Sequence, residues 1–153
     1  MSNTVATILT SAVQESAYLL NKDLDASSEE LCAHSLNDKC RTVLALIIEM
    51  TGFNLSISRM LKGETLTYAD MQAPSPNAEL AEARVNLSAS FETVCETIAT
   101  INEDDWMTQV TTPWGAHMTK AHAALWVSNH TMYHDGQINL IQVANGDTEV
   151  HWM

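Results

Sequence analysis

Basic residues are scarce in this chain. Its 153 residues include 7 Lys and Arg against 19 Asp and Glu, which gives a formal net charge of −12. Proteins that bind nucleic acid do so largely through Lys and Arg contacts to phosphates, and anionic membrane surfaces attract the same side chains. The composition therefore argues against both partners, and we interpret the acidic excess mainly as a source of solubility.

Cysteines and long apolar runs are also few. The three cysteines, Cys32, Cys40 and Cys95, form no CxxC pair, so the sequence predicts neither a disulfide framework nor a thiolate zinc site. Free thiols of this kind fit a reducing cytoplasm. Met1–Leu20 lacks the basic and apolar regions of a signal peptide, and no run approaches the roughly 18 apolar residues of a membrane span. We therefore expect a cytoplasmic protein.

Apolar residues recur at helical spacing over most of the chain. The predicted helices span about Thr4–Leu20, Asp38–Lys62, Pro76–Ile101 and Lys120–Asn145. The length fits one domain, residues 1–153. Four long amphipathic segments joined by connectors predict an all-α fold, a four-helix bundle, and such bundles build metal sites from side chains that project inward from facing helices.

The connectors carry signals of their own. Ser27–Glu30 offers helix-capping chemistry for a brief helix near Leu31, and Gly63 suits a left-handed end to the second long helix. Asn102–Met118 combines a β-prone stretch with Pro and Gly punctuation. We expect this segment to form a short extended or hairpin-like excursion before the last helix.

Two histidines, His130 and His134, stand four residues apart on the apolar stripe of the last helix. The stripe comprises Ala123, Trp126, Val127, His130, His134, Gln137, Ile138 and Ile141, whereas Ser128, Asn129, Asp135 and Asn139 fall largely off it. Side chains at this spacing are close enough for two imidazoles to hold one metal ion. The alternative is a pair of core histidines hydrogen-bonded to neighbours. Thr131 follows His130 where a zinc protease of the HExxH type needs Glu, which argues against that class.

A third ligand must come from another helix. Glu49 is the only carboxylate in the middle of the most hydrophobic segment, at the edge of its apolar stripe. Either Glu49 reaches solvent at the flank, or it faces the interior, where a buried charge requires a partner such as a metal.

The chain resembles the DinB-like, or YfiT-like, metal-binding four-helix bundles. The resemblance covers nearly the whole chain, and Asp135 stands where many relatives carry Arg. The residues that carry it are Asn129, His130, His134, Gly136, Gln137 and Ile138, preceded by Pro113, Trp114, Gly115 and Thr119.

The resemblance implies a cytoplasmic, often dimeric protein that holds a divalent metal, commonly zinc or nickel, on three histidines. Two of these match His130 and His134, but the third aligns with Leu46, which cannot ligate. Glu49, one turn along, would complete a set of two histidines and one carboxylate, which suits iron, manganese or zinc. The alternative is that the metal has been lost.

The resemblance also suggests an activity, because characterised members of this family look like thiol-dependent transferases and isomerases that use bacillithiol, mycothiol or glutathione. The first hypothesis is therefore a metal-dependent S-transferase acting on a small molecule, with a low-molecular-weight thiol at an open coordination position. The residues expected around that pocket are Trp126, Phe53 and Met50 as apolar walls and Gln137 as a hydrogen-bonding support. The second hypothesis is a non-catalytic dimeric binding or stress-response protein, and the third is a metal-dependent hydrolase.

Overall fold

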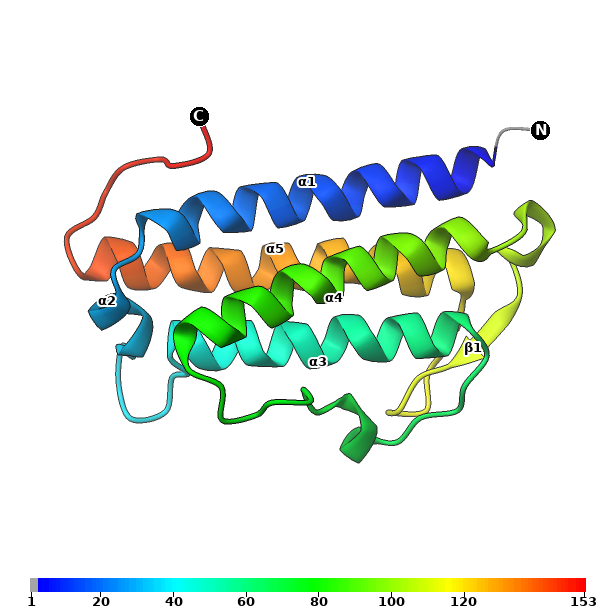
Figure 1. The fold of residues 1–153 in the computed structure, drawn as a ribbon, viewed down its shortest axis with the longest axis horizontal. Coiled ribbons are helices and arrows are strands. Elements are labelled where there is room, and N and C mark those ends of the chain that lie inside the picture. The colour runs from blue at the N-terminus through cyan, green and yellow to red at the C-terminus, as the bar shows by residue number, and fades with distance from the viewer. Residues whose placement is uncertain (1–2) are drawn as a thin grey trace.

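The predicted periodicity corresponds to four long helices in the computed structural model, which describes residues 3–153 (Figure 1). Within these residues the elements are α1 (Thr4–Ala26), α2 (Glu29–Ala33), α3 (Val43–Leu61), η1 (Tyr68–Met71), α4 (Leu80–Thr100), η2 (Glu103–Asp105), β1 (Gln109–Thr111), β2 (His117–Thr119) and α5 (Lys120–Ala144). The η elements are single 3₁₀ turns. The protein is thus mostly helical, with one small sheet among the described residues.

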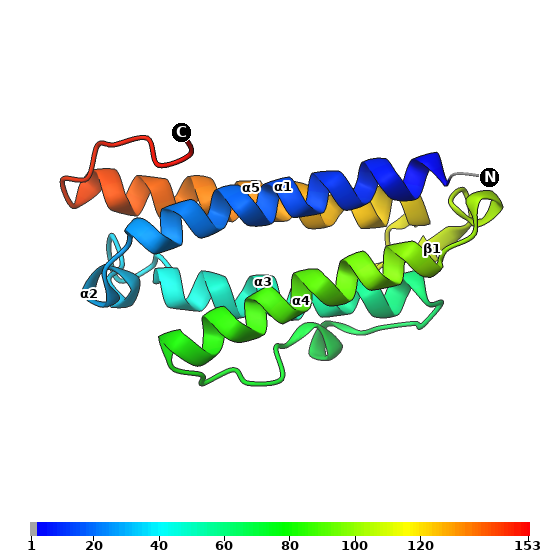
Figure 2. The same cartoon turned by 45° about the horizontal axis from the view of Figure 1, so that its top comes forward.

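The long helices lie in two pairs. α1 lies beside α5 and α3 lies beside α4, while α3 also packs on α5 and α1 on α4 (Figures 1 and 2). Each helix therefore buries side chains toward two neighbours. α3 is the most apolar of them, with residues such as Ile47 and Met50 fully buried between α4 and α5.

α3 also has the length and composition of a membrane-spanning helix. Val43–Leu61 reaches a mean hydropathy of 1.3, although polar residues interrupt its apolar run. Inside the fold 67% of the segment is buried. Its apolar side chains therefore form the centre of the protein core.

Three helix boundaries differ from the predictions. α1 continues to Ala26, past the predicted end at Leu20, because Leu24 is buried against the core. α3 begins at Val43, not Asp38, because the Asn37 side chain accepts hydrogen bonds from the next turn of backbone and Thr42 caps the helix.

The third boundary is the start of α4. The predicted cap at Ser75 and Pro76 opens only a turn, in which the Ala78 N–H donates to the Ser75 carbonyl, and the helix begins at Leu80. Other connectors match their predictions. Ser28 caps α2, and Gly63 follows α3 with a φ of 92°.

The predicted excursion before the last helix is a two-stranded antiparallel hairpin. Val110 pairs with Met118, and the Thr119 hydroxyl then caps α5 by accepting from the His122 backbone N–H. The hairpin thus fixes where α5 starts, and with it the position of every side chain along that helix.

The segment after α3 crosses back over that helix at Gly52. A Cβ at this position would lie 2.2 Å from the Met71 carbonyl oxygen and 2.7 Å from the Ala73 nitrogen. Only glycine lets the two backbones approach so closely.

α1 and α5 meet through a buried polar cluster, and here one prediction is wrong. Asp135, which the helical stripe placed largely outside the core, is completely buried beside Asp23 of α1. α5 packs on α1 as well as α3, so its buried arc is wider than a single stripe. Asp23 Oδ2 accepts from Asn139 Nδ2 at 2.8 Å and from Trp152 Nε1 at 2.6 Å, which ties the C-terminal tail to the body.

Both carboxyl oxygens of Asp135 are buried and lack a hydrogen-bond donor among residues 3–153. Burial, together with the neighbouring Asp23 carboxylate, raises the pKa of Asp135 from 3.8 to about 7. Asp135 therefore keeps a proton up to near-neutral pH.

Candidate metal centre

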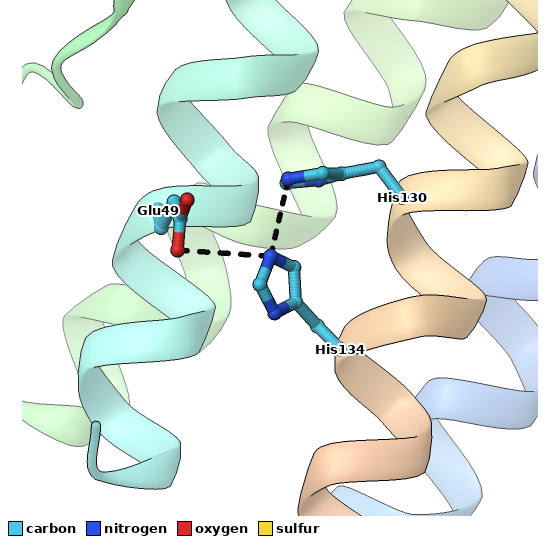
Figure 3. Close-up of side chains that lie close together, drawn as sticks. All are labelled: Glu49, His130 and His134. Atoms are coloured by element: carbon cyan, nitrogen blue, oxygen red, sulfur yellow. Dashed lines mark hydrogen bonds and ion pairs between the residues drawn. The ribbon is translucent and has the colours of Figure 1, made fainter. Parts of the chain in front are cut away.

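Three potential ligands converge where α3 faces α5. Glu49 projects from α3, and His130 and His134 project from successive turns of α5 (Figure 3). One donor atom from each of the three lies within 4.8 Å of the others. The tertiary structure thus brings together the ligand set expected from the sequence.

The separations within this group fit a single metal ion. His134 Nε2 lies 3.1 Å from His130 Nε2 and 3.6 Å from Glu49 Oε2. Ligands held at about 2.0–2.1 Å in a tetrahedral arrangement lie about 3.3 Å from one another. Both separations lie close to this value. The donors of His130 and Glu49 lie within 4.8 Å of each other, so these two side chains would move together to hold one ion.

His134 is oriented by Gln137 on the next turn of α5. Gln137 Oε1 lies 2.7 Å from His134 Nδ1, and because an amide oxygen only accepts, the imidazole carries its proton on Nδ1. Nε2 then carries a lone pair, which faces His130 Nε2 and Glu49 Oε2. Gln137 thus hydrogen-bonds to His134 and holds the tautomer in which Nε2 is able to ligate a metal.

His130 is held by packing. Its ring stacks on Phe53 with the centroids 3.9 Å apart, and its Nδ1 atom is buried without a hydrogen-bond partner among the described residues. Burial, helped by the nearby His134 and Arg41, lowers the pKa of His130 from 6.5 to about 4. Burial also lowers the pKa of His134. Both imidazoles are therefore neutral at neutral pH, as metal ligands must be.

Arg41 is a site residue that the sequence analysis missed. Its guanidinium forms an ion pair with Oε2 of Glu49, the oxygen that faces His134. Arg41 lies just before the cap of α3, in a turn that was predicted as helix. Because the sequence predicted that α3 starts at Asp38, it did not indicate that Arg41 lies next to Glu49.

The site opens into a cavity of about 540 Å³. This volume lies within the range of small-molecule sites. The cavity is lined by Leu36, Lys39, Cys40, Arg41, Leu46, Glu49, His130, Tyr133, His134, Gln137, Leu140 and Ile141. Leu46, where the third histidine was expected, thus faces the same space as Glu49.

The expected apolar walls lie elsewhere. Trp126 is not among the cavity residues, because its ring stacks on Trp114 and its Nε1 donates to His122 Nε2 at 2.9 Å. Met50 is fully buried and Phe53 supports His130 from behind. Leucines, Ile141 and Tyr133 form the walls instead. Ile141 lies on the predicted apolar stripe and Leu46 at the position of the family histidine, but nothing in the sequence indicated that either lines a cavity.

Comparison with protein-family models shows the family of the chain. A sequence model of the DinB superfamily matches residues 32–138, a stretch that runs from α2 into α5 and includes Glu49, His130 and His134. No curated protein sequence matches the chain. Because the matched stretch covers more than half of the sequence, the chain belongs to the DinB superfamily.

Proposed function

We propose that this protein binds one divalent transition metal through Glu49, His130 and His134. We further propose that it is an enzyme and that the bound metal takes part in catalysis. The observation that carries the proposal is the convergence of these donors, within 4.8 Å of one another, at a cavity open to small molecules. Two histidines and a carboxylate suit iron, manganese or zinc, and nickel is a further candidate from the family resemblance.

The reaction we propose is attack of a low-molecular-weight thiol on an electrophilic carbon of a small-molecule substrate: a carbon–sulfur bond forms, the bond to a leaving group breaks, and the leaving group departs with the thiol proton. When bound, the metal would lower the pKa of a thiol at its open position and so supply a thiolate nucleophile. His134 is held by its hydrogen bond to Gln137, and leucine side chains line the cavity beside it.

We further propose that the long helices form a four-helix bundle of the family type and that the protein is a cytoplasmic homodimer. The pairwise packing of α1, α3, α4 and α5 supports the bundle. Exposed apolar side chains on α5, among them Leu125, Tyr133, Leu140 and Val143, support a self-association face. Three free cysteines support a reducing compartment.

A metal-free binding protein is the second candidate. Without an ion, Glu49 has the ion pair with Arg41, and the two histidines have the 3.1 Å contact between their Nε2 atoms. Leu46 in place of the family histidine favours the same interpretation.

Metal content separates these candidates. We would purify untagged protein and measure bound metal by mass spectrometry, after refilling with zinc, nickel, manganese or iron(II). The variants are Glu49→Ala, His130→Ala and His134→Ala, with His122→Ala and Glu64→Ala as matched controls outside the cavity. We expect about one ion per chain in the wild type and in both controls, and loss in the three site variants.

Two results would contradict the proposal. An ion-free wild type after refilling would leave the metal-free candidate, and retention of metal by Glu49→Ala would remove Glu49 from the ligand set. A metal-loaded protein would then be assayed with and without glutathione, bacillithiol or mycothiol. Turnover that needs no thiol would favour a hydrolase over an S-transferase.

A further inference from the structure

The cavity is lined by two basic side chains and one acidic side chain, Glu49, in a protein that is strongly acidic overall. Lys39 and Arg41 both line it, although the whole chain has only 7 Lys and Arg residues against 19 acids. Two other arginines are engaged in ion pairs away from the cavity, Arg59 with Glu64 and Arg84 with Asp25. A cationic rim on such a protein favours an anionic ligand.

Most of the other residues that line the cavity are apolar. Leu36, Leu46, Leu140 and Ile141 line the space together with Tyr133. A ligand that fits both features has an apolar body and a negatively charged head. Among oxyanions we favour a carboxylate, because Arg41 already holds one in its present partner, Glu49.

Arg41 and a metal ion would compete for the same atom. Glu49 Oε2 pairs with the Arg41 guanidinium and is also the oxygen that lies 3.6 Å from His134 Nε2. A cation bound to Glu49 in the site would balance the negative charge of the carboxylate. The ion pair between Glu49 and Arg41 would then be weakened. The Arg41 side chain is 56% exposed, so it is free to turn toward the cavity.

We propose that the cavity binds a small amphipathic carboxylate through Arg41, and that the Arg41–Glu49 ion pair blocks this anion site until Glu49 engages a metal. The second half of this inference rests on the metal site proposed above. The first half depends only on Arg41 being released from Glu49, so it can be tested without any metal.

The metal-free test uses 4-phenylbutyrate as the probe and isothermal titration calorimetry in the presence of EDTA. Glu49→Gln removes the partner of Arg41, and we expect it to bind the probe at least about tenfold more tightly than the wild type, the effect of one charge-assisted hydrogen bond. The double variant Glu49→Gln with Arg41→Gln should lose this gain. Glu64→Gln is the matched control, because it releases Arg59 from its carboxylate outside the cavity.

The uncharged analogue 4-phenyl-1-butanol has the same apolar body, so it should bind all variants equally weakly. Equal affinity of the acid and the alcohol for Glu49→Gln would overturn the anion site. So would a Glu49→Gln variant that melts at the wild-type temperature and binds the acid no more tightly than the wild type does.

The metal-loaded test uses zinc. Zinc-loaded wild type should bind 4-phenylbutyrate at least about tenfold more tightly than metal-free wild type, and loaded Arg41→Gln should lose that gain while loaded Arg59→Gln keeps it. Unchanged affinity in loaded Arg41→Gln would assign the carboxylate to the metal and refute the role of Arg41. If zinc does not bind, the same test is run with nickel, manganese and iron(II). If none of the four binds, the proposed function and the metal coupling both fail, whereas the metal-free test still decides the anion site.

Discussion

Replacing Asp135 with Asn should stabilise the protein increasingly as the pH rises. Asp135 is completely buried, and its pKa is raised from 3.8 to about 7 by burial and by Asp23. The folded state therefore binds more protons than the unfolded state between these values. Stability that is fully present below pH 3.8 is lost as the pH rises toward 7. Asparagine has the same shape, carries no charge and can donate to Asp23.

The magnitude follows from the difference in proton affinity. The folded pKa lies about three pH units above the ordinary value, and each unit is worth about 1.4 kcal/mol, so ionised Asp135 costs about 4 kcal/mol. Between pH 5 and pH 8 the wild type should lose about 3 kcal/mol that Asp135→Asn does not lose.

Urea denaturation followed by circular dichroism, in EDTA and at closely spaced pH values, measures this difference. Asp104→Asn is the matched control, because Asp104 is exposed and the same chemical change there should leave the pH profile of the wild type unaltered. If the stabilities of Asp135→Asn and wild type run parallel from pH 5 to pH 8, the buried proton does not exist and the reasoning fails.

Three further predictions concern the site and the core. Leu46→His should raise zinc affinity at least about tenfold by adding a third imidazole, measured by competition with a chromophoric chelator, and an unchanged affinity would place Leu46 out of reach of the ion. Gln137→Leu should lower zinc affinity about 10- to 100-fold, because the Nδ1–H of His134 loses its acceptor; full affinity would show that Gln137 does not orient the ring. Gly52→Ala should reduce the free energy of unfolding by about 1–3 kcal/mol, because its Cβ meets the Met71 carbonyl. A thermal melt like that of the wild type would mean that the loop moves away at little cost.

Local signals predicted most of the secondary structure. Apolar periodicity placed the four long helices, and Pro, Gly and Thr119 placed the hairpin and the start of α5. The boundaries that failed depend on distant contacts or competing local bonds. α1 extends past Leu20 because Leu24 and Asp23 find partners elsewhere in the fold, and α3 starts late because Asn37 binds the turn before it.

The sequence alone determined that His130 and His134 point the same way, because a spacing of four residues on one helix fixes their relation by helix geometry. Which residues of other helices meet them depends on how far each helix slides and rotates in the packed core. Only the tertiary structure therefore decided that Glu49 faces the two histidines, that Arg41 pairs with Glu49, and that Asp135 is buried. Those relations between helices are set by packing of the whole core, which no single segment encodes.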